Sequence, residues 1–208
     1  FMWYKNSLVI TIVSVVLTLF ICYFVAYGLT MYNFKLKNFL FFLVIATMMV
    51  PFEILMLPLY KEIIALHLID TYTGVIIIGL CNASTIFFFR QYLSGLPREL
   101  LDAARIDGLG EFGIFWKIML PLVKPTMITM LLLGINNCWN DLLWPLIVAN
   151  ASTMRTLSNG LAIFIGDRTS EYSLAFTAAT VSMLPMLILY IFGQKYFVAG
   201  QVSSGIKG

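Results

Sequence analysis

The chain has 208 residues and a formal net charge of +3; 61% of the residues are apolar and only 11% are charged. Soluble domains usually contain about 45–50% apolar and about 25% charged residues, so this chain lacks the polar surface that a soluble fold requires. The composition argues against a soluble enzyme, a secreted domain and a disordered chain. The small and dispersed positive charge argues against nucleic acid as a partner.

Five apolar segments are long enough to cross a bilayer, which takes about 20 residues of helix. They are residues 7–30, 39–60, 71–89, 118–148 and 174–192. The fourth is long enough for a tilted or broken helix, because Pro121, Pro125 and Pro145 interrupt it. The predicted fold is an all-α polytopic membrane protein with five visible transmembrane helices, embedded in the cell membrane with the lipid bilayer as its main solvent.

Lysine and arginine are distributed unevenly between alternate connections. Nine of the 13 basic residues fall in one set, within residues 35–37, 90–124 and 195–207, and four fall in the other. Because cytoplasmic loops carry the excess of positive charge, the first set and the C-terminus are predicted to be cytoplasmic. Five spans then leave the N-terminus outside. A sixth span before Phe1 would restore the usual arrangement and would fit a chain that does not begin with methionine.

The cytoplasmic segment 93–117 is polar enough to leave the membrane, yet its pattern predicts a short helix. Pro97 suits the first helical position, Glu99 and Asp102 suit the positive end of the helix dipole, and Arg105 suits the negative end. Gly108 is a typical helix stop. Such a helix is marginal alone in water, so it either lies on the lipid surface or docks into a cytoplasmic partner.

The sequence of this segment resembles a known motif. Residues 102–108 read Asp-Ala-Ala-Arg-Ile-Asp-Gly, and residues 121–125 read Pro-Leu-Val-Lys-Pro. This pattern resembles the EAA loop of ABC importer permeases, with Asp102 where the family usually has Glu. Trp-Asn-Asp-Leu-Leu-Trp-Pro-Leu at 139–146 and the tail at 194–208 resemble the carbohydrate branch, in particular the permeases of the maltose-permease G type. The resemblance extends over almost the whole chain.

The resemblance implies a function. The chain would be the membrane-spanning permease subunit of an ATP-driven sugar importer, forming half of the translocation path. It would lack the first of the family's usual six helices and would couple through the loop at about 94–125. The residues implied in ATPase coupling are Glu99, Asp102, Ala103, Ala104, Asp107, Gly108, Pro121 and Pro125.

The same resemblance implies the partners. They are a second permease subunit in a heterodimer, two cytoplasmic ATPase subunits, and an extracytoplasmic sugar-binding protein. ATP would be bound by the ATPase subunits, so no cofactor, metal-binding or catalytic residue is assigned to this chain, and it is not expected to be an enzyme.

Polar residues gather near the end of the fourth segment. The spacings 136/140 and 137/141 place Asn136, Asn140, Asn137 and Asp141 pairwise on a helix, with Trp139 among them. Intramembrane polar groups often line a water path, and sugars are bound by hydrogen bonds and aromatic faces, so these residues are candidates for the translocation path. The alternative is hydrogen bonding between helices, or a helix end at the outer interface with tryptophan in the aromatic belt.

An ion-coupled secondary transporter for a small polar solute is the alternative function. It predicts inverted repeats and an ionisable residue near the middle of the membrane. We find no convincing repeat, and Glu53 and Asp141 both lie near the ends of their segments. The identity of the transported solute does not follow from the sequence.

Overall fold

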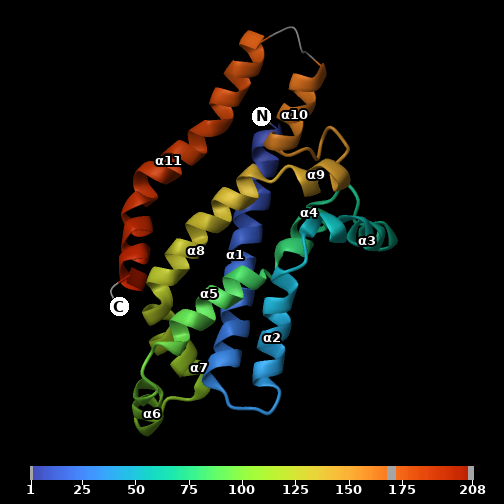
Figure 1. Ribbon diagram of the computed structural model, residues 1–208. Coiled ribbons are helices and arrows are strands. Elements are labelled where there is room, and N and C mark those ends of the chain that lie inside the picture. The colour runs from blue at the N-terminus through green and yellow to red at the C-terminus, as the bar shows by residue number, and fades with distance from the viewer. Residues whose placement is uncertain (1, 168–171, 206–208) are drawn as a thin grey trace. The chain divides into compact units, whose positions relative to one another are not determined.

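The computed structural model describes residues 2–167 and 172–205, and Figure 1 labels its helices. Within these residues the chain forms helices and no strand, which confirms the all-α prediction. η1 is a 3-10 helix and η2 is a π-helix. The elements are α1 (Met2–Met31), α2 (Lys37–Met48), α3 (Phe52–Ala65), α4 (Tyr72–Ile76), η1 (Ile77–Gly79), α5 (Ala83–Ser94), α6 (Glu99–Ile106), α7 (Glu111–Gly113), η2 (Ile114–Met119), α8 (Leu120–Asn140), α9 (Leu143–Val148), α10 (Leu157–Asp167) and α11 (Tyr172–Gly205).

Three helical stretches of the described chain are long and apolar enough to cross a membrane. They are α1, Glu111–Asn140, and Phe176–Gly193 within α11. The number rises to five if the bent pair of α2 and α3, and the bent pair of Tyr72–Gly79 and α5, each count as one span. The five predicted segments therefore correspond to these five stretches, but two of them are interrupted.

The second predicted segment, 39–60, is broken before Pro51. Proline disfavours a helical conformation in the residue before it and lacks a backbone donor, so α2 ends at Met48. Pro51 then precedes α3 with φ −58° and ψ 133°.

The third predicted segment, 71–89, is broken at Asn82. The Asn82 Oδ1 atom accepts a hydrogen bond from the Thr85 backbone nitrogen at 2.9 Å and caps α5. That helix continues beyond Arg90 to Ser94, so the end predicted at residue 89 was wrong. The segment contains the polar residues Asn82, Ser84 and Thr85, and asparagine is a preferred N-cap residue, so the sequence offered a cap signal that the prediction of one continuous span did not use.

The fourth predicted segment, 118–148, was wrong at both ends. The helical stretch begins at Glu111 and ends at Asn140, and α9 forms a separate short helix. Pro145 explains the early end, because its ring would clash with the carbonyl of Asp141 if one helix ran through both. In the last segment, α11 extends well past residue 192 to Gly205. Ile206, Lys207 and Gly208 of the predicted tail lie outside the described residues, as does Arg168.

The chain forms two compact units. The first is built from Phe1–Thr18, Val50–Cys81 and Leu131–Lys195, and the second from Leu19–Met49, Asn82–Met130 and Tyr196–Gly208. Each has its own core, described in turn below.

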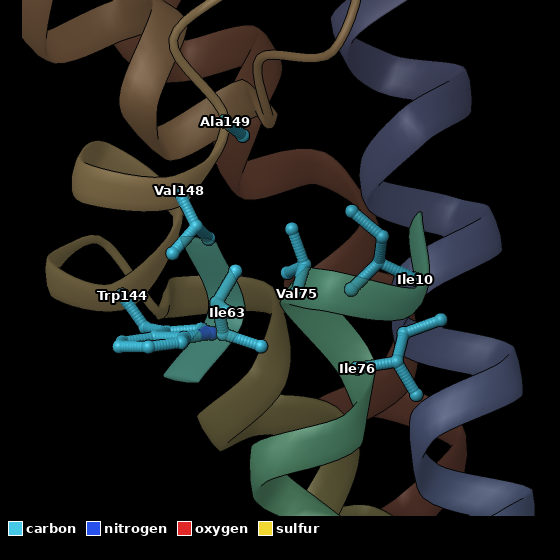
Figure 2. Packing of buried hydrophobic residues seen from close by; sticks show 7 residues of the cluster. All are labelled: Ile10, Ile63, Val75, Ile76, Trp144, Val148 and Ala149. Atoms are coloured by element: carbon cyan, nitrogen blue, oxygen red, sulfur yellow. The ribbon is translucent and has the colours of Figure 1, made fainter. Parts of the chain in front are cut away.

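An apolar cluster forms the core of the first unit. Figure 2 shows its seven residues, Ile10, Ile63, Val75, Ile76, Trp144, Val148 and Ala149. The Trp144 indole nitrogen donates to the Gly74 carbonyl oxygen at 3.1 Å, which satisfies the one polar atom of a buried ring. A Cβ atom at Gly74 would collide with the Leu68 carbonyl oxygen, so only glycine lets α4 approach so closely.

Aromatic rings fill the core of the second unit. Tyr23 of α1 lies 5.6 Å from Phe89 of α5 and 4.9 Å from Phe115 of η2, measured between ring centroids. Tyr27 meets Phe115 edge to face at 5.0 Å. Such pairs contribute about 0.5–1.5 kcal/mol each beyond the area that they bury. They hold η2, the segment that follows α6 and α7, against the end of α1.

Large apolar side chains are exposed along the long helices. Ile12 and Phe24 of α1 are 59% and 66% exposed, and Phe176 and Phe192 of α11 are 70% and 73% exposed. Water-facing surfaces rarely carry so much continuous apolar area. Lipid satisfies these faces, in agreement with the composition of the chain.

Candidate coupling site

Helix α6 occupies the position where the sequence predicted a short polar helix. Its first turn carries Glu99 and Asp102 and its last turn carries Arg105, as expected from the helix dipole. The prediction for Pro97 was wrong by two residues. The helix begins at Glu99, and the Arg98 carbonyl accepts the backbone hydrogen bond of Leu101 at 2.9 Å. Pro97 instead lies in the turn before the helix.

The end of α6 is fixed by Gly108. This residue has φ 80°, a left-handed conformation that costs little only for glycine. Its N–H donates to the Arg105 carbonyl at 3.0 Å, and the N–H of Leu109 donates to the Ala104 carbonyl at 3.0 Å. This pair of bonds is the Schellman arrangement, which satisfies two carbonyls that the helix end would leave open. The predicted helix stop at Gly108 is confirmed.

The apolar residues of α6 divide between two faces. Leu101 and Ala104 are 4% exposed each and face the rest of the second unit, where α6 contacts η2. Leu100 is 40% exposed and Ile106 is 86% exposed, and Ala103 is exposed between them. We call Leu100, Ala103 and Ile106 the outer stripe. Spacings of three residues place them along one side of the helix, where no described residue covers them fully.

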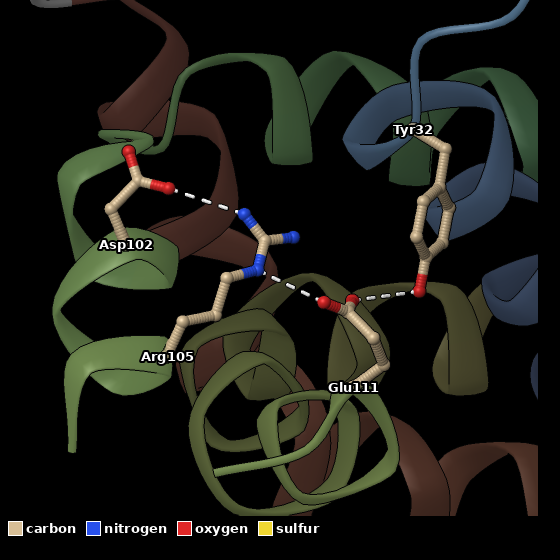
Figure 3. Close-up of polar contacts among 4 residues, drawn as sticks. All are labelled: Tyr32, Asp102, Arg105 and Glu111. Atoms are coloured by element: carbon tan, nitrogen blue, oxygen red, sulfur yellow. Dashed lines mark hydrogen bonds and ion pairs between the residues drawn. The ribbon is translucent and has the colours of Figure 1, made fainter. Parts of the chain in front are cut away.

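A chain of polar contacts ties α6 to two other elements (Figure 3). The Arg105 Nη1 atom lies 3.2 Å from the Asp102 Oδ1 atom, and its Nε atom donates to the Glu111 Oε1 atom at 2.9 Å. The second Glu111 oxygen accepts a hydrogen bond from the Tyr32 hydroxyl at 2.9 Å. Because Tyr32 follows α1 and Glu111 begins α7, the contacts link α6 to both of these helices. Asp102, the residue that departs from the family pattern, therefore has a partner within α6.

The Tyr32 hydroxyl is protonated, as its hydrogen bond to Glu111 requires. Partial burial, followed by the hydrogen bond to Glu111, raises the pKa of the Tyr32 phenol above its usual value. The phenol therefore keeps its proton at physiological pH and donates it to the carboxylate. Sequence reasoning did not find Tyr32 or Glu111, because they lie 79 positions apart and belong to no local motif.

The return path from α7 into α8 contains two irregularities. Residues Ile114–Met119 form a π-helix, and Pro121 and Pro125 follow within the next two turns. Each proline removes one backbone donor from the helical ladder. The Tyr92 hydroxyl donates to the Leu122 carbonyl at 2.9 Å and fixes the proline-containing turn to α5. Pro121 and Pro125 are both exposed.

The predicted polar set of the translocation path lies at the end of α8, in the first unit. Asn136, Asn137 and Asn140 are exposed, and the Asn140 Nδ2 atom donates to the Asn136 carbonyl at 2.8 Å. Asp141 lies just beyond the helix and is half-buried. Trp139 is only 4% exposed, and its indole nitrogen donates to the Ser182 carbonyl of α11 at 3.2 Å. The structure thus places the asparagines on an accessible surface and Trp139 in the packing between α8 and α11.

Metal binding has little support in the described part of the chain. Within residues 2–167 and 172–205, no group of three or more His, Cys, Asp or Glu side chains is arranged to hold a metal ion.

Comparison with known proteins agrees with this architecture. Residues 18–201 match the family of binding-protein-dependent transport system inner membrane components. The chain is 47% identical over its full length to the arabinooligosaccharides transport system permease protein AraQ of Bacillus subtilis and covers 74% of that protein. It is 31% identical to the sn-glycerol-3-phosphate transport system permease protein UgpE of Brucella abortus, over 96% of this chain and 71% of the relative.

A solved structure shows the same fold. It belongs to a bacterial ABC transporter that imports the acidic polysaccharide alginate, and it superposes with a TM-score of 0.83 at 26% identity, over 94% of this chain and 74% of that one. The chain belongs to the family of binding-protein-dependent transport system inner membrane components. It is a multi-pass cell-membrane permease component of a transporter complex that contains other subunits. The ion-coupled alternative is not favoured by these relatives.

Proposed function

We propose that the chain is the membrane-spanning permease subunit of an ATP-driven sugar importer and forms half of its translocation path. The sugar class is supported by relatives named for arabinooligosaccharide transport, which are much more similar to this chain than the glycerol-phosphate permeases are. We therefore favour an oligosaccharide as the imported solute. A second permease subunit and an extracytoplasmic sugar-binding protein complete the path.

The outer stripe of α6 is the observation that carries the coupling role. Leu100, Ala103 and Ile106 present apolar surface to the outside of a short helix that is otherwise polar. In the proposed complex this stripe sits in a cleft of a cytoplasmic ATPase subunit, one of two that bind and hydrolyse ATP. Movement of the cleft reaches the spans through Arg105, Glu111 and Tyr32, because these residues connect α6 to α7 and to the end of α1.

The eight predicted coupling residues divide between contact and support. Glu99, Asp102, Ala103 and Asp107 are exposed and available to the ATPase. Ala104 is buried, Gly108 shapes the end of the helix, and the two prolines stiffen the return path. The coupling helix and the C-terminus are cytoplasmic in this proposal, since nine of the 13 basic residues then lie on that side.

The translocation path is proposed to pass the end of α8. Asn136, Asn137 and Asn140 offer amide groups that suit sugar hydroxyls, and Asp141 adds a carboxylate. Trp139 fixes α8 against α11 through its bond to Ser182.

Replacing an exposed apolar side chain of α6 by a charged one tests the coupling role. Ile106→Glu buries a charge in the ATPase cleft without disturbing the inner face of α6, so we expect about tenfold or greater loss of co-purified ATPase and of ATP-dependent sugar uptake. Leu36→Glu is the matched control, because Leu36 is 60% exposed and lies outside α6. Ala104 is unsuitable, since its substitution would disturb packing within the chain. Unchanged ATPase association in Ile106→Glu would refute the docking role, and uptake driven by an ion gradient without ATP would refute the importer class.

A further inference from the structure

A small cavity with a basic lining lies within the second unit, beside the start of α6. It has a volume of about 250 Å³ and lies among the end of α1, the beginning of α2 and the end of α5. Lys37, Arg90 and Arg98 contribute three cationic side chains to its wall, and Asn38 and Ser94 contribute neutral polar groups. The part of the chain that the structure describes contributes no acidic residue to the wall.

None of the three cations forms an ion pair with a carboxylate of the described residues. Among the described residues, the ion pairs are those that Arg105 makes with Asp102 and Glu111. The Lys37 Nζ atom donates to the Thr30 backbone carbonyl at 2.7 Å, which holds the ammonium at the cavity without neutralising it. Three like charges around one cavity repel one another, so the arrangement calls for an anion between them.

Arg90 carries the clearest sign of a missing acceptor. Its guanidinium carbon lies 3.6 Å from the centre of the Phe41 ring, which fixes the plane of the group. Its Nε atom is buried and has no hydrogen-bond acceptor. A buried donor without an acceptor is costly and uncommon in native structures, so the Arg90 guanidinium is incompletely paired. Arg90 also lines the cavity, where an anion would offset its charge.

The chemistry of the wall suits a phosphate group. A guanidinium fork matches two phosphate oxygens, and an ammonium adds a point charge. Met31, Leu93 and Leu96 add apolar atoms to the cavity wall. Phe39 and Phe42, which follow the lining residue Asn38 on α2, are 56% and 63% exposed. An acyl chain can lie along such a surface, whereas a free phosphate ion gains nothing from it.

We propose that this cavity binds the phosphate of an anionic phospholipid headgroup. Its place at the ends of three helices suits the membrane–water boundary, where basic pockets between helices bind such headgroups. The choice of the cytoplasmic leaflet rests on the proposed function, because that function sets the sidedness. The bound headgroup would lie in the cavity and neutralise the cations of its wall.

Native mass spectrometry of the purified transporter complex tests the proposal. Complexes are taken from nanodiscs containing phosphatidylglycerol or only phosphatidylcholine, and retained lipids are counted for wild type, Lys37→Gln, Arg90→Lys and Lys37→Gln/Arg90→Gln. Lys35→Gln is the matched control, because it removes a charge from the same connection without touching the cavity. We expect phosphatidylglycerol retention to fall about fivefold for each charge removed, to fall less in Arg90→Lys, and to be unchanged in Lys35→Gln.

Two further outcomes distinguish a lipid phosphate from free phosphate and state what would refute the site. Displacement of the lipid by millimolar inorganic phosphate, with phosphate bound in its place, would overturn the lipid assignment in favour of a soluble anion. Equal phosphatidylglycerol retention in Lys37→Gln and Lys35→Gln would overturn the site altogether. Lys37→Gln leaves the buried Arg90 contacts intact, so this comparison still tests the site if the double variant does not fold. Lipid counts do not depend on sugar uptake, so failure here is distinguishable from failure of the proposed function.

Discussion

Helix α6 and the apolar cluster of the first unit are stabilised in different ways. The cluster is closed, because its members are at most 8% exposed and its buried tryptophan has its polar atom satisfied. Helix α6 is more open, because Ile106 is 86% exposed and the ion pair between Arg105 and Glu111 has both side chains nearly half exposed. Buried apolar area stabilises the first region, while α6 combines a small buried face, Leu101 and Ala104, with a backbone cap and exposed charged contacts. The contrast suits a rigid frame in one case and an exchangeable contact surface in the other.

The largest expected effect comes from emptying the apolar cluster. Trp144→Ala removes a buried ring and leaves the Gly74 carbonyl without its donor, so we expect about 3–5 kcal/mol of destabilisation. Thermal unfolding of the detergent-purified protein would measure it. Leu143→Ala is the control, because that side chain is 47% exposed and should change the midpoint little. Equal midpoints for the two variants would show that the cluster is not the frame described here.

A smaller effect is expected at the end of α6. Gly108→Ala places a Cβ atom at φ 80°, and although the space around it is open, the backbone conformation costs about 1–2 kcal/mol. Amide hydrogen exchange in α6 should therefore be about 5–30-fold faster. Gly110→Ala is the matched control, since Gly110 has φ −71° and equally open surroundings. Unchanged exchange in Gly108→Ala would mean that the Schellman turn does not limit the opening of the helix.

The smallest effect is expected from the charged contacts. Glu111→Gln weakens the bonds to Arg105 and Tyr32, and because the pair is exposed we expect only about 0.2–1 kcal/mol. Exchange of the α6 amides should be at most about fivefold faster at low salt, and the difference should shrink as salt screens the wild-type contact. Glu62→Gln on α3 serves as the control. A difference that persists at high salt would show that shape, not charge, holds the helix.

Local rules predicted helix α6 well because the sequence signals of this helix are local. Acidic residues in the first turn, Arg105 in the last and Gly108 beyond it each act within a few positions, and all are found where expected. The sequence predicted that the helix begins at Pro97, whereas it begins at Glu99. Helix ends are hard to place to within one or two residues, because several residues of a turn can each precede a helix. The apolar positions alone did not show which of them face outward, since α6 is short and its inner face is set by contact with η2.

The sequence predicted the number of apolar segments, but it did not predict that two of them are broken into separate helices. Composition reveals how much chain can lie in lipid, and it does not reveal where the helix stops within that chain. Pro51 was visible in the sequence, yet the cap at Asn82 depends on a side chain turning back to Thr85. The Tyr32–Glu111 contact and the basic cavity depend on chain segments far apart in sequence, so no local pattern could indicate them.

The π-helix at Ile114–Met119 has a geometric consequence for the proposed coupling between α6 and the membrane-spanning helices. A π turn contains more residues than an α turn, so this stretch contains extra backbone between α7 and α8. If one residue were released into ordinary α register, the part before it would swivel by about 100° and advance by about 1.5 Å relative to the part after it. A screw motion of this kind would let a short stroke at α6 become a twist of the span, and spin-label distances across the stretch, with and without ATP, would record it.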